Sequence, residues 1–158
     1  FEDASILWES PERWWIDDFA LADVTNDGVA DVSLSLWKEG NYGRSKPFWV
    51  EGNDERIRNH FFVFKFVDDR LKPLWHSSNL DSPNCEFKIA DVDGDGKRDL
   101  VTIEGDYSDW PICLGKHIAL WEWNGWGFSN EWRSPEGKFQ NLNVEKMNQK
   151  VLITFDEL

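Results

Sequence analysis

The sequence contains an internal repeat, and this repeat constrains the fold more than any other feature. Residues 19–37 (FALADVTNDGVADVSLSLW) correspond to residues 87–105 (FKIADVDGDGKRDLVTIEG) with a constant offset of 68 positions. Residues 60–78 correspond to residues 117–135 with an offset of 57 positions, because the first copy carries a longer loop before its second half. Repetition at this spacing is typical of a fold built from copies of one supersecondary unit.

Each copy contains four stretches that are expected to form strands. In the first copy, Val32, Leu34 and Leu36 alternate with Ser33 and Ser35, and this period of two indicates a strand. Helical patterns are almost absent, and the connections are rich in the turn residues Gly, Asn, Asp and Pro. The expected strands lie near 18–22, 31–37, 61–67 and 71–76, and near 86–90, 99–104, 117–123 and 127–133.

Four antiparallel strands in each copy predict an all-β chain, a β-propeller-like array of four-stranded antiparallel blades. A β-sandwich with a duplicated motif is the alternative. Residues 7–11 (LWESP) match a fourth strand, and residues 139–155 match the first two strands of a third copy without the acidic loop. We therefore expect a single domain, 1–158, of two full blades with a partial blade at each end. Its parts are a blade end at 1–11, blades at 12–77 and 78–135, and a partial blade at 136–158.

An array that starts and stops within a blade is not expected to close alone, because propellers need about four or more blades. The chain is then either part of a longer protein or pairs with a second copy through its open strand edges. The opening Phe1-Glu2-Asp3 has neither a Met nor a basic start, which favours a processed or excised segment.

An acidic loop lies between the first two expected strands of the second copy. Asp91, Asp93, Asp95 and Asp99 hold positions one, three, five and nine of this loop, and Gly96 permits a sharp turn at position six. Calcium takes six to eight oxygen ligands at about 2.3–2.6 Å, and alternate carboxylates on a tight loop can converge on one ion. The alternative is an ordinary Asp-rich turn.

The loop opens like an EF-hand loop but does not continue as one. An EF-hand needs a bidentate Glu at position twelve, and Thr102 occupies that position. The flanking residues are strand-like rather than helical, since Ile89-Ala90 precedes the loop and 100–103 (LVTI) follows it. Asp99 must therefore close the site, which makes this a calcium loop between two strands.

The segments IADVDGDGKRDLV and LADVTNDGVADVSL resemble the FG-GAP/VCBS repeats of integrin-like and bacterial secreted β-propellers. The resemblance covers the two full copies. It implies that the loop binds calcium between the first two strands of a blade, largely for stability. It also implies that Asp91, Asp93, Asp95 and Asp99 are ligands and that Lys97 contributes its backbone carbonyl.

The corresponding loop of the first copy departs from this pattern. Asp23, Asp27 and Asp31 hold positions one, five and nine, and position three is Thr25, whose hydroxyl can ligate calcium but carries no negative charge. We expect two calcium ions, with weaker binding at 23–31, because affinity follows the number of charged ligands. Binding should stabilise the fold, since the ion removes the repulsion among carboxylates on one short loop.

Charge and cysteine content bear on partners and compartment. The formal net charge of −13 disfavours nucleic acid and anionic membrane surfaces. No apolar run approaches the roughly 18 residues of a membrane span, so membrane insertion is not expected. Cys85 and Cys113 leave a disulfide and two free thiols equally open. The family resemblance implies a secreted or cell-surface protein.

The segments 38–59 and 105–116 follow the second expected strand of each copy and are candidates for a recognition surface. Exposed aromatic side chains stack on sugar rings or anchor protein partners. The alternative is that the aromatic residues cap hydrophobic layers between blades. The candidate ligand-binding residues are Tyr42, Trp49, Tyr107 and Trp110.

Two further pairs of residues occupy equivalent positions in the copies. His60 and His117 each begin the third expected strand, and this duplication favours a repeated structural role over a catalytic or metal-binding pair. Trp75 and Trp132 are equivalent in the fourth strand, and we expect them to cap the layers between blades.

Three functions follow as hypotheses. The leading one is a non-catalytic extracellular binding module that recognises a carbohydrate or a protein, with calcium stiffening its blades. The second is a structural segment that self-associates through strands near 1–10 and 139–155. The third is a polysaccharide-acting enzyme, a lyase or hydrolase, because calcium-binding propellers, which this chain resembles, occur in those enzyme classes. The sequence contains no nucleophile elbow, phosphate-binding loop or zinc pattern.

Overall fold

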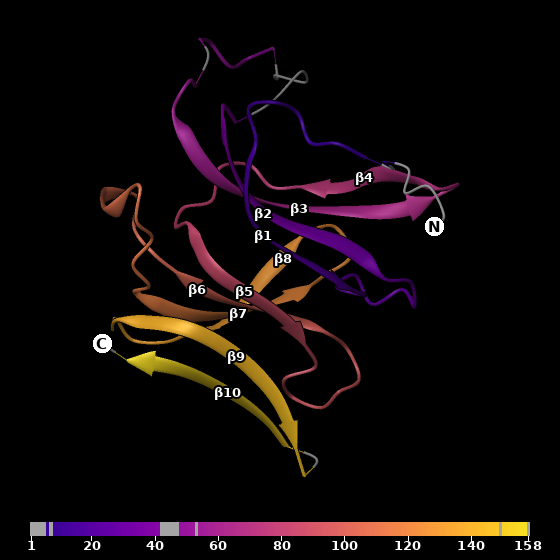
Figure 1. Cartoon of the computed structure of the whole chain (residues 1–158), viewed down its shortest axis with the longest axis vertical. Helices are drawn as coiled ribbons and strands as arrows, with labels where there is room; N and C mark the ends of the chain where they lie inside the picture. Colours follow the sequence, from indigo (N-terminus) through magenta and orange to yellow (C-terminus); the bar gives the residue numbers. More distant parts are fainter. Residues whose placement is uncertain (1–5, 7, 42–47, 53, 149, 158) are drawn as a thin grey trace.

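The structure, a computed structural model, describes residues 6, 8–41, 48–52, 54–148 and 150–157. These residues are all-β and form ten strands in three antiparallel sheets (Figure 1). Their one helical element is the short 3-10 helix η1, Tyr107–Asp109, and they contain no helix long and apolar enough to cross a membrane. The strands are β1 (Trp15–Ala22), β2 (Asp31–Glu39), β3 (Ile57–Val67), β4 (Arg70–His76), β5 (Asn84–Ala90), β6 (Asp99–Glu104), β7 (His117–Trp123), β8 (Phe128–Arg133), β9 (Phe139–Met147) and β10 (Lys150–Glu157).

Each sheet is a simple meander in which strands that are consecutive in the chain pair with each other. The first sheet has the order β1-β2-β3-β4 and the second has the order β5-β6-β7-β8. The third sheet is the hairpin of β9 and β10. The expected four-stranded antiparallel units and the two strands of a third copy are therefore confirmed. The described residues do not close into a ring of sheets (Figure 1).

The two four-stranded sheets repeat each other in register as well as in sequence. The β1–β2 pairing shifts after Ile16, and the β5–β6 pairing shifts after the equivalent Asn84. The β3–β4 pairing shifts after Val63, and the β7–β8 pairing shifts after the equivalent Leu120. Because a slip of one residue would turn each side chain to the other face, these matched bulges put equivalent residues on the same face of both sheets.

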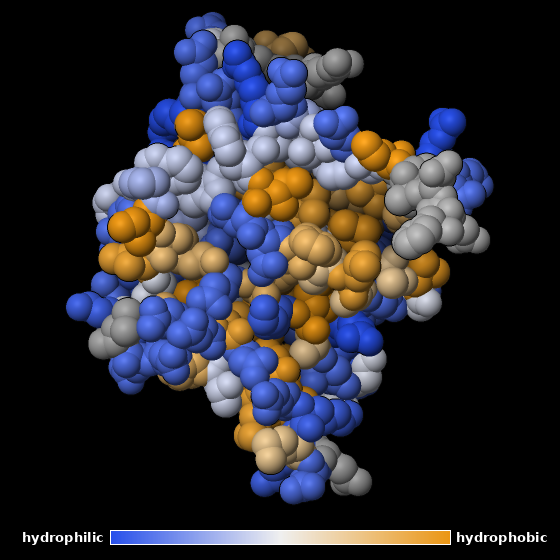
Figure 2. Space-filling view, in the orientation of Figure 1, coloured by the Kyte–Doolittle hydropathy of each residue, from blue (hydrophilic) through white to orange (hydrophobic). Residues whose placement is uncertain are grey.

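Apolar layers join each sheet to the next. Phe61 and Val63 of the first sheet pack with Phe87 and Leu100 of the second. A second layer joins β6 and β7 to the hairpin, where Leu142 is buried. Burying one large apolar side chain contributes about 1.5–3 kcal/mol, so these layers dominate the stability of the stack. On the face seen in Figure 2, apolar side chains also reach the surface in the middle of the molecule.

The alternation predicted for residues 31–37 is confirmed. Leu34 and Leu36 point into an apolar cluster on the outer face of the first sheet. Ser33 and Ser35 are buried on the opposite face. Both faces of β2 are thus covered, because a strand in the middle of this sheet has a neighbouring layer on each side.

The prediction of a strand at 7–11 is wrong for the described residues 8–11, which have no strand pairing. A strand needs a neighbouring backbone to pair with, and Pro11 has no N–H to donate. Trp8 instead packs on Phe64, with ring centroids 5.7 Å apart, and also contacts Trp14. This segment therefore covers the outer apolar face of the first sheet as a loop.

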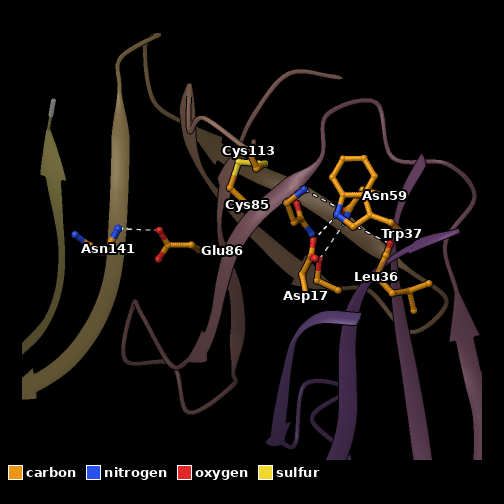
Figure 3. Close-up of a disulfide and its surroundings, with 10 residues drawn as sticks. Asp17, Leu36, Trp37, Asn59, Cys85, Glu86, Cys113 and Asn141 are labelled. Atoms are coloured by element: carbon orange, nitrogen blue, oxygen red, sulfur yellow. Dashed lines mark hydrogen bonds between the residues drawn. A yellow bond between two sulfur atoms is a disulfide. The ribbon is translucent and has the colours of Figure 1, made fainter. Parts of the chain in front are cut away.

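A disulfide between Cys85 and Cys113 joins β5 to the loop after η1 (Figure 3). The residue equivalent to Cys85 in the first sheet is Asp17, which accepts a hydrogen bond from the indole Nε1 of Trp37. The residue equivalent to Trp37 is Gly105, where an added Cβ would lie 2.7 Å from Cys85 Sγ. The disulfide thus fills the space that the indole ring occupies in the first sheet.

The structural role expected for the paired histidines is confirmed. Nδ1 of His60 lies 3.3 Å from the carbonyl oxygen of Ser77, and Nδ1 of His117 lies 3.0 Å from that of Ser134. A carbonyl oxygen can only accept a hydrogen bond, so Nδ1 is the donor in both rings. His60 is fully buried, and its Nε2 has no hydrogen-bond partner within the described part of the chain.

The expectation for the paired tryptophans holds for one of them. Trp75 packs between the first two sheets against Trp123 and Phe128, with centroid distances of 6.1 and 5.3 Å. Trp132 is 49% exposed. The difference follows from the third sheet, which in the described residues has two strands and offers no outer strands to cover β8.

Burial and, to a smaller extent, the nearby Lys38 cation lower the pKa of His60 to about 4. An unfolded histidine titrates near pH 6.5, so between about pH 6.5 and about pH 4 the unfolded chain binds a proton that the folded chain does not. Above pH 6.5 the histidine is neutral in both states and costs no stability. As the pH falls from about 6.5 to about 4, the free energy of unfolding should decrease by at most about 3 kcal/mol because of His60. Urea unfolding across this pH range measures the loss.

Two variants isolate this effect from the titration of carboxylates. His60→Gln keeps an N–H donor but cannot bind the proton, so its stability should fall less steeply toward pH 4 than that of the wild type. The free energy of unfolding of His117→Gln should depend on pH as steeply as that of the wild type. The same pH dependence in the wild type and both variants would contradict the prediction.

Candidate metal centre

The loop between β5 and β6 brings three carboxylates together. Asp91, Asp93 and Asp95 each place one oxygen within 4.8 Å of the others. Two ligands of one calcium ion, each about 2.4 Å from it, can be separated by up to about 5 Å. Within the described part of the chain, this is the one group of three or more His, Cys, Asp or Glu side chains with such spacing. The geometry therefore fits one cation.

Backbone hydrogen bonds hold these carboxylates, here called the Asp triad, in position. The N–H groups of Gly94 and Gly96 donate to the two oxygens of Asp91, at 2.7 and 3.1 Å. Asp93 and Asp95 each accept a hydrogen bond from the N–H two residues further on. Both glycines have φ values near +85°, which side-chain-bearing residues rarely adopt (+84° and +88°). Each carboxylate oxygen keeps a further lone pair, so the turn does not exhaust its capacity to bind a cation.

Asp99 stands beside the Asp triad at the first position of β6. Its Oδ2 accepts a hydrogen bond from the N–H of Val92 at 3.0 Å. Burial raises its pKa, and the negative charges of Asp93 and Asp95 raise it further. The loop thus concentrates negative charge that a bound cation would neutralise.

Lys97 reaches across to a residue that the sequence analysis did not single out. Its Nζ lies 3.1 Å from Oε1 of Glu122 on β7 and 3.6 Å from Oδ2 of Asp95. Glu122 is the main cause of the raised pKa of Lys97. The repeat offset could have found Glu122, because it maps this position onto Lys65 of the first copy.

The loop between β1 and β2 has a similar turn. Asp23 accepts hydrogen bonds from the N–H groups of Asp27 and Gly28, at 3.0 and 2.8 Å. Asp31 is fully buried, and its Oδ2 accepts both the N–H and the hydroxyl of Thr25, at 3.0 and 2.9 Å. Burial is the main cause of the raised pKa of Asp31.

Lys65 of β3 enters this first loop. Its Nζ donates a hydrogen bond to Oδ2 of Asp27 and lies 3.6 Å from Oδ1 of Asp31. The structure therefore brings Asp27 and Asp31 together around an ammonium group, and Thr25 is hydrogen-bonded to Asp31. No pattern within the loop could indicate this, because Lys65 lies far along the chain on another strand.

Asn26 connects the two loops. Its Oδ1 accepts a hydrogen bond from the N–H of Arg98 at 2.6 Å, and its Nδ2 donates to the carbonyl of Arg98 at 3.2 Å. This two-point contact joins the first sheet to the loop that carries the Asp triad, so ordering of one loop restrains the other.

An open cleft of about 420 Å³ lies where the segments after β2 and β6 meet. Trp110, 49% exposed, packs on Trp37 with ring centroids 4.5 Å apart. The guanidinium carbon of Arg58 lies 4.1 Å from the ring centre of Tyr107, a cation–π contact. Trp37 lies on β2, just outside the segments predicted for recognition, whereas Arg58 of β3 lies within the predicted segment 38–59 but was not singled out.

The predicted recognition residues separate into groups. Tyr107 and Trp110 line this cleft. The hydroxyl of Tyr107 also has a structural task, since it donates to the carbonyl of Leu80 at 2.7 Å. Trp49 is 70% exposed and packs on Phe48, and it is not among the residues that line the cleft. Tyr42 lies outside the described residues.

Asp93→Asn tests the repulsion within the Asp triad. In chelator, the variant should melt about 1–2 °C higher than the wild type, because it removes one of three like charges. In saturating calcium it should melt lower, because it removes a charged ligand. Scanning calorimetry in chelator and in calcium measures whether the melting temperature rises in the first condition and falls in the second. Glu131→Gln, which removes an exposed charge from β8, is the control and should show neither shift.

In comparisons with known proteins, no family model matches the chain, and neither a curated protein nor a solved structure matches it significantly. The resemblance to FG-GAP/VCBS repeats therefore rests on the residues of the two loops and their place between strands.

Proposed function

We propose that this chain is a non-catalytic, calcium-stabilised binding module built from propeller-type blades. The observation that carries the proposal is the Asp triad, whose oxygens lie within 4.8 Å of one another in the loop that joins the first two strands of a four-stranded sheet. Carboxylate oxygens are the ligands that calcium prefers, and the resemblance to FG-GAP/VCBS repeats supports the same ion.

A bound ion would stabilise more than its own loop. The unfolded loop has no preformed site, so the free energy of binding adds to the free energy of folding. Asp99 connects the loop to β6 through its bond to Val92, and Asn26 connects it to the first sheet through Arg98. Calcium would therefore stiffen the contact between the two sheets.

The packing of the sheets supports a propeller-type arrangement. The first strands of the two four-stranded sheets, β1 and β5, lie in contact, as the inner strands of neighbouring blades would. Apolar layers stack each sheet on the next. Further blades would come from more chain or from a second copy.

Assembly through open edges is a second candidate function. Phe19 and Leu21 on the edge strand β1 are 64% and 70% exposed. Large apolar side chains on an unpaired edge favour association with another sheet. In this case the module would serve as a segment of a larger or oligomeric propeller.

The cleft with Trp37, Arg58 and Trp110 is the surface we propose for recognition. An exposed indole offers a flat apolar face to a sugar ring or a protein side chain, and Arg58 adds a cation beside it. The partner would be a carbohydrate or another extracellular protein. The disulfide Cys85–Cys113 supports an extracellular location, because such bonds persist in oxidising compartments.

Thermal unfolding with calcium and with chelator tests the proposed function. At calcium about a hundredfold above its dissociation constant, the melting temperature should rise by about 5–10 °C. Asp95→Asn should lose most of this rise, because it removes a charged ligand but keeps the side-chain oxygen that accepts the N–H of Lys97. A wild-type chain that melts at the same temperature under both conditions would refute calcium stabilisation.

Binding to immobilised polysaccharides and to extracellular matrix proteins tests the recognition surface. Trp110→Ala should weaken binding by about tenfold or more, since indole anchors carry much of the energy of such contacts. Trp126→Ala is the matched control, because Trp126 is 79% exposed but does not line the cleft. Equal binding by both variants would exclude this cleft, and breakdown of a polysaccharide would contradict a non-catalytic role.

A further inference from the structure

The two Asp-rich loops share a turn but differ in what approaches them. In both, the N–H of a glycine at position six donates to the Asp at position one: Gly28 to Asp23 at 2.8 Å, and Gly96 to Asp91 at 3.1 Å. In both, the Asp at position five accepts the N–H two residues further on. The backbone therefore presents the side chains at these positions in the same way.

The difference lies on the third strand of each sheet. Lys65 on β3 and Glu122 on β7 are equivalent in the repeat. Lys65 pairs directly with Asp31 across the β2–β3 ladder, so its ammonium is delivered to the first loop. Glu122 brings a carboxylate to the second loop, where its Oε1 lies 3.1 Å from Nζ of Lys97. One strand position thus carries opposite charges in the two sheets.

We propose that Lys65 is a built-in cation that takes the place of calcium in the loop 23–31, and that the chain binds a single calcium ion, at 91–99. This inference rests on the proposed function for the second loop and revises the expectation of two ions. Lys65 Nζ contacts Asp27 and Asp31, the carboxylates at positions five and nine of the first loop.

The surroundings of Lys65 suit this role. Its side chain is only 19% exposed, and that of Asp31 is fully buried. Oδ1 of Asp31 has no hydrogen-bond partner among the described residues, and the ammonium 3.6 Å away provides its counter-charge. An ammonium attached to β3 reaches the loop without the entropy cost of capturing a free ion. A calcium ion would have to displace this ammonium or lie beside a like charge.

A fixed cation and an exchangeable one give the two sheets different responses to calcium. The first sheet keeps a cation beside Asp27 and Asp31 whatever the calcium concentration, because this cation is covalently attached. The second sheet has an excess of carboxylates, including Glu122, and depends on the ion. Calcium would thus control the second loop and, through Asn26, its contact with a first loop that stays ordered.

Isothermal titration with calcium chloride on the full chain tests the proposal by counting ions. The wild type should bind one ion. Lys65→Glu should bind two, because the first loop then has the same charge on its third strand as the second. Glu122→Lys should bind none, because it adds a second ammonium to that of Lys97, which lies 3.6 Å from Asp95, and removes the carboxylate with which Lys97 pairs. Adding Asp27→Asn to Lys65→Glu should return the count to one, which locates the gained ion.

Two further variants keep this test decisive. Lys116→Glu changes the same charge on a lysine that pairs with Asp106, outside both loops, and should leave the count at one. Lys65→Gln removes the ammonium without adding a carboxylate. In chelator, the melting temperature of Lys65→Gln should be lower than that of the wild type. When calcium is added, its melting temperature should rise by more than that of the wild type.

The outcomes separate the inference from the proposed function. A wild type that binds two ions, one of them lost in Asp27→Asn, overturns the role of Lys65 but leaves the second site intact. No gain of an ion by Lys65→Glu, and no additional calcium response by Lys65→Gln, also overturn it. A wild type that binds no calcium overturns the proposed function, while a gain of one ion on Lys65→Glu would still support the role of Lys65.

Discussion

Each four-stranded sheet has two apolar faces, and the rest of the structure depends on covering both of them. Phe61 and Val63 on one face of β3 require the second sheet, whereas Phe62 and Phe64 on the other face require the loop that carries Trp8. A single sheet of this kind would leave one of these faces in water, which costs about 25 cal/mol for each Å² of apolar surface. Stacking of successive sheets is therefore the condition under which the loops and the cleft acquire fixed positions.

Polar contacts between the sheets make this stack specific. The buried Asn59 of β3 accepts a hydrogen bond from the N–H of Asn84 at the start of β5, at 3.0 Å. Glu86 of β5 accepts the N–H of Asn141 in the hairpin, at 2.7 Å (Figure 3). Apolar layers have little directional preference, whereas these bonds are satisfied in one arrangement only. The N–H of Asn59 also donates to the hydroxyl of Tyr107 at 3.3 Å, which holds η1 beside β3, and the Asn26–Arg98 contact holds the Asp triad beside the first loop.

Much of the fold could be predicted from local patterns. Alternation over 31–37 and the constant offsets of the repeat were enough to locate the eight strands of the two four-stranded sheets and the hairpin of a third copy, because strand pairing between neighbours in sequence needs only short turns. The same logic failed at 8–11, where a matching sequence has no strand beside it. Of the candidate site, the spacing of Asp91, Asp93 and Asp95 predicted a convergent group, since alternate residues on a tight turn point to one centre.

The sequence by itself determined the β architecture, its duplication and the acidic turns, because these depend on residues close together in the chain. The tertiary structure alone decided which groups meet those turns and surfaces. Lys65 reaches Asp27 from another strand, Glu122 reaches Lys97, and Trp110 reaches Trp37. The disulfide was likewise open in sequence until β5 and the loop after η1 were placed together. Such contacts depend on how strands pair and sheets stack. The difference between the two loops is therefore set by residues on the third strand of each sheet, Lys65 on β3 and Glu122 on β7, which lie outside the loops.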